Sequence, residues 1–272
     1  MTKTLIKGGT IISMDRKTGD FAKGDILVNG TEIEKIGKSI RSPGAKVIDA
    51  TGMIVMPGFV NAHLHTWQTG IRGVAGNWSI PEYLHQMHAT IAPRYTAKDT
   101  YLGNLIGALN QINLGATTIF DWCHNNSTPA HSDAGVRGLQ EAGIRALFGH
   151  GSPKPDAKKG AKHFSEIPHP RAELERLRKG ALSDDDGLVS LAMSALGVDF
   201  SIWDVVEHDF ALAKELDLII STHVWGAPTR LNPDGYKKLS KLKLLDKRHN
   251  LVHGNYLPDD ELQLVLDSGA SV

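Results

Sequence analysis

The feature that most constrains the fold of this chain is an apolar segment that ends in two histidines. Residues 54–60 are mostly apolar and lead directly into Asn61, Ala62, His63, Leu64 and His65. On an extended strand, residues two apart point to the same side, about 6 to 7 Å from each other, so both imidazoles can reach one metal ion. Two histidines at this spacing are more often a coincidence than half of a metal site. The surrounding sequence therefore has to distinguish a metal site from a coincidence.

Composition narrows the classes of partner. At 272 residues and 41% hydrophobic content, the chain can form one large barrel or two smaller domains. Lys plus Arg and Asp plus Glu number 30 each, so no charge excess points to nucleic acid or to a membrane surface. We expect a small-molecule substrate instead.

The lack of targeting segments and of paired cysteines predicts a cytoplasmic location. The first residues lack an apolar core of signal-peptide length, and no later run approaches the roughly 18 apolar residues that would span a bilayer. Cys123 is the single cysteine, so an internal disulfide is excluded, which is typical of a reducing compartment.

Residues 1–56 are predicted to form part of a small β-domain. Residues 26–28 and 31–36 read as a hairpin, and Asn29 and Gly30 between them suit a two-residue type I′ turn. Residues 4–12 and 46–48 would add further strands. The second predicted domain covers residues 57–272.

After Pro57, predicted strands alternate with predicted helices. The helix over residues 97–113 shows apolar residues at helical spacing, Thr96 and Asp99 resemble a capping box, and Gly115 ends it. A proline-containing stretch, residues 152–170, is predicted to be a long loop, either a lid or a surface excursion. This alternation favours a parallel sheet and a (β/α) barrel. The other predicted strands cover residues 117–120, 144–148, 188–195, 218–223 and 250–253, and the other predicted helices cover residues 132–142, 171–182, 205–216 and 258–267.

Histidines lie at five of the six predicted strand ends. In a (β/α) barrel the active site forms at the C-terminal ends of the strands, so these side chains should converge. Each alone would more often be structural, but together they favour a metal site. They are His63 and His65, His124, His150, His223 and His253.

Several residues near these strand ends are predicted to contact a substrate. Tryptophan rings there would stack on a flat ring, although packing in the core is an equally good interpretation. The predicted substrate-binding residues are Trp67, Gln68, Trp122 and His150. His85 and His88 are placed either at the cavity or on the surface, and the histidines away from strand ends, His131, His163, His169, His208 and His249, are expected to be solvated.

Residues 49–65 resemble the first-strand signature of the amidohydrolase superfamily. They are similar above all to the branch that holds cytosine, guanine and S-adenosylhomocysteine deaminases and the triazine hydrolases. Residues 221–223 resemble the fifth-strand metal ligand of that branch, and residues 251–254 resemble its sixth-strand histidine. The resemblance covers the whole chain.

The resemblance implies a (β/α)8 TIM-type barrel with a small β-sandwich. It implies that His63, His65 and His223 bind one Zn²⁺ or Fe²⁺, and that His253 contacts the metal-bound water or the substrate. Three imidazoles leave a position for water, and the metal lowers the pKa of that water toward about 7. The implied activity is hydrolysis of a C–N or C–X bond of a cyclic, heteroaromatic small molecule by metal-bound hydroxide. His253 and His124 are the predicted proton-transfer residues.

Two departures from the family pattern limit this prediction. Gly226 stands where the deaminases usually carry a glutamate, and the chain ends at Val272, where a seventh strand would begin. We therefore expect this chain to lack the strand-eight aspartate that the resemblance implies. Asp121 and Asp199 are the candidate substitutes for it. Three explanations remain open: a fragment of a longer protein, a split enzyme completed by a C-terminal chain, or a degenerate non-catalytic homologue. Open strand edges also favour a homo-oligomer.

Overall fold

The computed structural model describes residues 3–225 and 230–272. The chain divides into two compact units, Met1–Phe59 and Val60–Val272, each described by itself. This division lies close to the boundary expected after residue 56. Gly226, predicted to stand in place of the glutamate of the deaminases, lies outside the described residues.

The first unit is a five-stranded sheet. Strand β1 pairs antiparallel with β2 and parallel with β4 and β5, and β2 pairs antiparallel with β3. In the predicted hairpin Asn29 pairs with Glu32, so Gly30 and Thr31 form the turn, one residue later than expected. Gly30 has a φ of 62°, which glycine adopts without steric cost. The strands are β1 (Lys3–Ile11), β2 (Phe21–Asn29), β3 (Glu32–Gly37), β4 (Lys46–Asp49) and β5 (Ile54–Val55).

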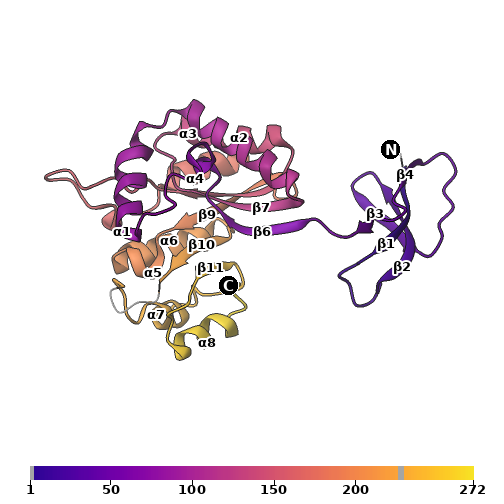
Figure 1. Ribbon diagram of the computed structural model, residues 1–272. Coiled ribbons are helices and arrows are strands. Elements are labelled where there is room, and N and C mark those ends of the chain that lie inside the picture. The colour runs from indigo at the N-terminus through magenta and orange to yellow at the C-terminus, as the bar shows by residue number, and fades with distance from the viewer. Residues whose placement is uncertain (1–2, 226–229) are drawn as a thin grey trace. The chain divides into compact units, whose positions relative to one another are not determined.

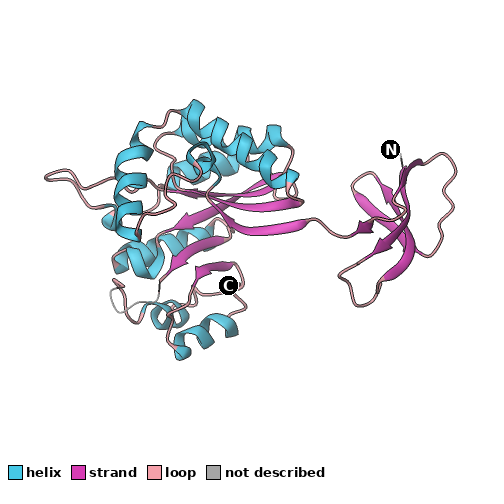
Figure 2. Cartoon of the chain, in the orientation of Figure 1, coloured by secondary structure: helices cyan, strands magenta, loops and turns pink. Residues whose placement is uncertain are grey.

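The second unit contains a six-stranded sheet whose strands follow one another in chain order from β6 to β11 (Figures 1 and 2). The registers from β7 to β11 are all parallel, which confirms the predicted parallel sheet of alternating strands and helices. A parallel bridge between Asn250 and Ser271 adds a backbone contact beyond β11. The strands are β6 (Phe59–Leu64), β7 (Ala116–Cys123), β8 (Arg145–Gly151), β9 (Val189–Ala195), β10 (Ile220–Val224) and β11 (His249–His253).

Helices α2 and α3 pack side by side against the sheet (Figure 1). Helix α2 has the bounds and the capping box that the sequence predicts, since Thr96 accepts a hydrogen bond from the backbone N–H of Asp99. The short helices α5 and α7 were not predicted, and of the loop or helix expected around His88 the structure has a helical segment. The α-helices are α1 (Ile80–Tyr83), α2 (Ala97–Asn113), α3 (Pro129–Ala142), α4 (Arg171–Lys179), α5 (Gly197–Phe200), α6 (Trp203–Glu215), α7 (Gly235–Lys241) and α8 (Asp259–Asp267); the other helical segments are η1 (Thr66–Ile71), η2 (Leu84–Ile91), η3 (Ala92–Arg94) and η4 (Phe164–Glu166).

The core of the second unit lies between the sheet and these helices. Ile119, Phe148 and Met193 on three neighbouring strands are fully buried against apolar side chains of the helices. Full burial of each such side chain contributes about 1.5 to 3 kcal/mol, so this layer holds the strand ends in fixed positions.

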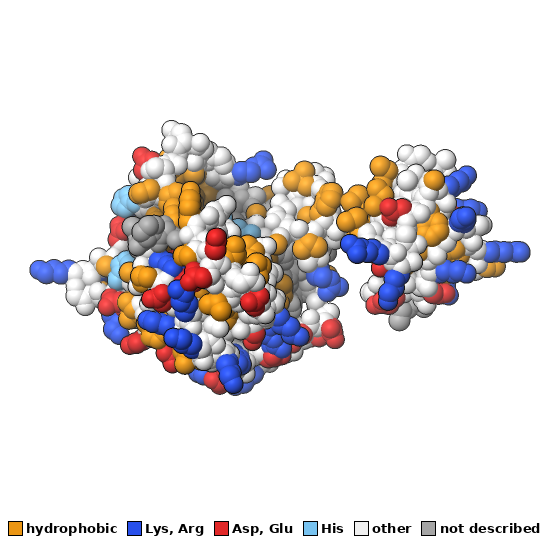
Figure 3. Space-filling model, turned by 90° about the horizontal axis from the view of Figure 1, so that it is seen from below, with side chains coloured by type: hydrophobic (Ala, Val, Ile, Leu, Met, Phe, Trp, Pro, Cys, Tyr) orange, Lys and Arg blue, Asp and Glu red, His pale blue; other side chains and the backbone are white. Residues whose placement is uncertain are grey.

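The surface fits the charge balance of the sequence. On the face shown in Figure 3, Lys and Arg side chains are interspersed with Asp and Glu. None of the helices in the described part of the chain is long and apolar enough to cross a membrane.

Candidate metal centre and active-site cavity

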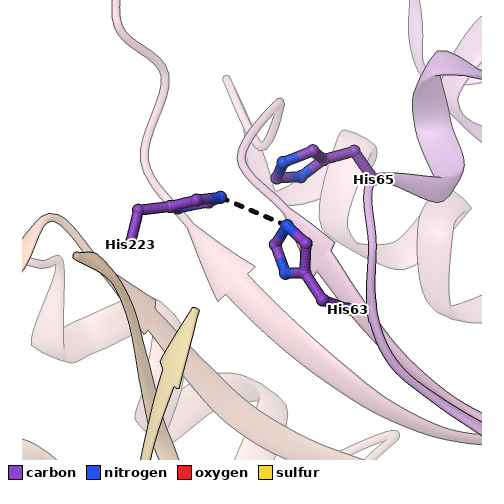
Figure 4. Close-up of side chains that lie close together, drawn as sticks. All are labelled: His63, His65 and His223. Atoms are coloured by element: carbon purple, nitrogen blue, oxygen red, sulfur yellow. Dashed lines mark hydrogen bonds between the residues drawn. The ribbon is translucent and has the colours of Figure 1, made fainter. Parts of the chain in front are cut away.

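Three histidines from two strands converge at one point. His63 lies in β6, His65 is the first residue after β6, and His223 lies in β10 (Figure 4). One ring nitrogen from each lies within 4.8 Å of the others. This is the only such group of His, Cys, Asp and Glu side chains found among the described residues. We call these three residues the histidine cluster.

The spacing of the nitrogens suits a small metal ion. The Nε2 atoms of His63 and His223 lie 3.3 Å apart. Two ligands at about 2.0 to 2.1 Å from a tetrahedral zinc ion would be separated by roughly 3.3 to 3.4 Å. The two imidazoles are therefore already placed at the separation that shared coordination requires.

Hydrogen bonding orients His65. Its Nδ1 lies 2.8 Å from the carbonyl oxygen of Trp122. Because a carbonyl only accepts, Nδ1 carries the proton and the lone pair of Nε2 remains available to a metal. In His63 the Nε2 faces His223, and the buried Nδ1 has no hydrogen-bond partner among the described residues.

Burial keeps these imidazoles neutral at pH 7. It lowers the pKa of His63 to about 4 and that of His65 to about 3, with smaller contributions from nearby histidines. It lowers the pKa of His223 well below its usual value. Neutral imidazoles are good ligands for zinc and for iron, so the donor set fits one divalent ion of either kind.

The histidine cluster opens into a cavity of about 390 Å³, which we call the main cavity. Its walls are mainly aromatic and aliphatic, which is typical of small-molecule sites. His253, at the end of β11, also lines it, with its ring centroid 6.0 Å from that of His63. The φ of His253 is 79°, an uncommon conformation for a residue with a side chain. The apolar lining includes Leu84, Trp122, Phe164, Leu196, Phe200 and Trp225.

His124 borders the main cavity and stacks on His65, with ring centroids 4.4 Å apart. The indole N–H of Trp67 donates to its Nδ1 over 2.9 Å. Because an indole only donates, the neutral His124 carries its proton on Nε2. His124 is thus held in one tautomer beside the cluster.

Trp122 and Trp67, both predicted as substrate contacts, occupy different positions. Trp122 lines the main cavity, and its ring lies 4.3 Å from that of His223. Trp67 is fully buried in the core behind His124 and does not line the cavity. We therefore correct its predicted role to that of a packing and orienting residue.

Gln68 and His150 also lie off the main cavity. Gln68 donates to the hydroxyl of Tyr83 over 2.7 Å and faces a neighbouring cavity. His150 is buried, and its Nδ1 lies 2.9 Å from Nε2 of His169. Neither position supports the substrate contact predicted for it, because neither residue lines the main cavity.

The two carboxylates predicted as substitutes for the strand-eight aspartate of the family do not line the main cavity either. Asp121 accepts hydrogen bonds from the backbone of Thr66 and from the Asn104 side chain. Asp199 accepts from the backbone N–H of Trp225. Both carboxylates therefore stabilise backbone segments around the site.

Sequence reasoning missed two residues that line the main cavity, Tyr83 and Lys154, and left His88 either at the cavity or on the surface, whereas the structure places it at the cavity. Lys154 follows β8 by three residues, and that position was the available signal, because loops after barrel strands build the site. Burial lowers the pKa of His88 to about 2 and that of Lys154 to about 7. Two histidines expected to be solvated, His169 and His249, are buried, so that expectation was wrong.

Known proteins resemble this chain in sequence. A family model described as "Amidohydrolase family" matches residues 54–266. The 5-methylthioadenosine/S-adenosylhomocysteine deaminase of Symbiobacterium thermophilum is 36% identical over 154 residues, 56% of this chain and 34% of that protein. The protein of the same name from Pyrococcus furiosus is 25% identical over 277 residues, 98% of this chain and 62% of that protein. The chain thus spans less than two thirds of these curated relatives.

Solved structures share the fold. The zinc-complexed atrazine chlorohydrolase of Arthrobacter aurescens superposes with a TM-score of 0.82 at 21% identity, over 98% of this chain and 64% of that one. An adenosine deaminase from Xanthomonas campestris with bound zinc gives 0.75 at 19% identity, over 99% and 61%. At these identities the likeness establishes the fold.

Proposed function

Because the chain belongs to the amidohydrolase family, we propose that it is a metal-dependent hydrolase that removes an amino group or a similar substituent from a nitrogen-containing aromatic ring. The observation that carries this proposal is the histidine cluster, whose three ligand nitrogens lie within 4.8 Å of one another at the base of an apolar cavity. The names of the relatives, deaminases of adenosine-type compounds, support the C–N bond as the target.

The residues of the cluster would hold one divalent metal ion, with zinc favoured because zinc accompanies two structures of the same fold. Such an ion, when bound, supplies Lewis acidity and lowers the pKa of a water molecule. His253 borders the same space, where it can contact the substrate or the water.

The main cavity suits a flat ring. Trp122, Phe164 and Trp225 supply aromatic surfaces, and a ring seated among them is desolvated next to the cluster. The carbonyl oxygen of Trp122 fixes His65, and the indole N–H of Trp67 fixes His124, so two imidazoles beside the ring keep one orientation. Such preorganised groups place the reacting carbon against its attacking water without reorientation.

Ammonia release tests this proposal. The purified chain, loaded with zinc, is incubated with adenosine, 5′-deoxyadenosine and 5′-methylthioadenosine, and separately with aminotriazines. We expect ammonia from at least one of these substrates, and we expect its loss on chelation and in His63→Ala and His223→Ala. A chain that binds zinc stoichiometrically and releases no ammonia would contradict the proposal and support the non-catalytic homologue.

A further inference from the structure

The main cavity contains one cationic side chain and, among its described lining residues, no carboxylate. Removal of an amino group needs a proton donor, because the nitrogen otherwise departs as a poor leaving group. The donor therefore has to be found among the imidazoles, the Tyr83 phenol and the Lys154 ammonium. We propose that Lys154 donates the proton to the departing nitrogen, an inference that rests on the proposed hydrolytic function.

Lys154 lies where such a donor is needed. Its Nζ sits over the ring of Trp122, 4.9 Å from the ring centroid. The same indole contacts His223, with centroids 4.3 Å apart, and His65, with centroids 5.6 Å apart. The amine and the histidine cluster thus border one indole from within one cavity, so a ring that reacts at the cluster places its substituent beside Lys154.

His124 and Tyr83, two other polar groups of the cavity, are poorer donors. His124 has a pKa well below its usual value because it is buried, so it is a neutral imidazole at pH 7. Burial raises the pKa of the Tyr83 phenol, whose oxygen accepts a hydrogen bond from Gln68. Lys154 differs, because burial lowers its pKa to about 7, so it gives up its proton readily.

The surroundings of Lys154 keep this proton labile. No ion pair to a carboxylate is found for it in the described part of the chain, and a cation over an indole is only weakly held. The titratable groups that face it come from the cluster side and from the opposite side. Those beside the main cavity are His65, His88, His124 and His223, and those beside a second cavity that Lys154 also lines are His169 and Asp209.

A second, small cavity gives Lys154 a route for recovering its proton. Lys154 lines this cavity together with Ser194, His169 and Asp209, and its volume of about 10 Å³ is about the smallest that holds one water molecule. Asp209 accepts hydrogen bonds from the backbone N–H of His169 and from Nδ1 of His208. The His208 side chain is 38% exposed, so the chain of polar groups reaches solvent.

The proposed step balances. Water adds its hydroxyl to the ring carbon and releases its remaining proton to solvent. Lys154 regains a proton from solvent through His208 and Asp209. The ammonium of Lys154 then protonates the amino nitrogen while the C–N bond breaks, and the bonding electron pair leaves with ammonia. The reaction consumes one water and releases one ammonia, and Lys154 ends each cycle protonated.

A matched pair of substrates tests the proposal. Adenosine must lose ammonia, which needs a proton, whereas 6-chloropurine riboside loses chloride, which needs none. We expect Lys154→Gln to lower kcat for adenosine by about 10²- to 10⁴-fold and to leave kcat for the chloro compound nearly unchanged. Lys158→Gln is the control, because Lys158 is an exposed lysine of the same loop. Metal content should be equal in all variants.

Two further variants separate proton donation from charge. Lys154→Arg keeps the charge but holds its proton too tightly, so it should behave like Lys154→Gln. Lys154→Cys alkylated with 2-bromoethylamine restores an amine and should recover activity. The natural Cys123 is buried and therefore protected from the reagent.

The outcomes distinguish the two proposals. If the wild-type chain releases neither ammonia nor chloride, the proposed function fails and the role of Lys154 with it. If it turns over both substrates and Lys154→Gln lowers both rates equally, or neither, only the proton-donor assignment fails. An independent readout is the titration of the ¹³C-dimethylated amine by NMR: a pKa near that of an exposed lysine would overturn the assignment.

Discussion

Two walls of the main cavity differ in construction. Strand ends build one wall, with His63, His223 and His253 on β6, β10 and β11. The segment after β8 builds the other wall with Lys154 and Phe164. The strand wall is fixed by hydrogen-bonded register and by the core behind it, whereas the loop wall depends on the path of one connection. We infer that the strand wall holds the metal and that the loop wall adapts the site to its substrate.

The core behind the strand wall and the rim of the cavity should differ most in what a tryptophan contributes to stability. Trp67 is fully buried behind the strand wall, and Trp225 is 40% exposed beyond β10. We expect Trp67→Ala to lower the free energy of unfolding by about 3 to 5 kcal/mol. Trp225→Ala should lower it by less than about 1 kcal/mol. Urea unfolding followed by circular dichroism measures both, and equal losses would contradict the distinction.

A glycine in β8 and a glycine in the loop after β8 should also differ in what their substitution costs in stability. A Cβ at Gly149, within β8, would meet Ser194 Oγ at 2.3 Å and Phe120 Cε1 at 2.6 Å. A Cβ at Gly160, in the loop, would meet nothing within 4 Å, although its φ of +81° strains any other residue. We expect Gly149→Ala to cost about 1 to 3 kcal/mol or more, and Gly160→Ala about 1 kcal/mol. Thermal unfolding of the two variants compares them, and a larger loss in Gly160→Ala would reverse the assignment of rigidity.

The two ends of β11 carry histidines in opposite environments. His253 lines the cavity, whereas His249 is buried, with its Nε2 2.9 Å from the hydroxyl of Thr222. Burial lowers the pKa of His249 to about 3, so the unfolded chain binds a proton there between about pH 6.5 and pH 3 and the folded chain does not.

This difference predicts a pH dependence of stability. The contribution of His249 is complete above about pH 6.5 and is lost as the pH falls, by up to about 1.4 kcal/mol per unit. His249→Gln should therefore flatten the dependence of the unfolding free energy on pH between 6.5 and 5, relative to the exposed-residue control His85→Gln. An unchanged slope in His249→Gln would show that His249 is protonated in the folded chain.

The difference between the strand wall and the loop wall also explains which features the sequence could predict. The alternation of strands and helices, helix α2 with its capping box, and the convergence of His63, His65 and His223 follow from local periodicity and from the rule for strand ends. Trp67 and His150 were misplaced because sequence position near a strand end does not reveal which way a side chain points. Lys154 was missed because it lies on an irregular segment after β8, where tertiary packing alone brings a side chain into the cavity.

The metal content of the purified protein tests the central claim most directly. Zinc per chain is measured by mass spectrometry after dialysis, for the wild type, for the double variant His63→Ala/His223→Ala and for the control His85→Ala. We predict about one zinc in the wild type and the control, and an affinity lowered by more than about 100-fold in the double variant, since loss of outer-shell partners alone costs 10- to 100-fold. Equal zinc in all three proteins would contradict the assignment of the histidine cluster as the metal site.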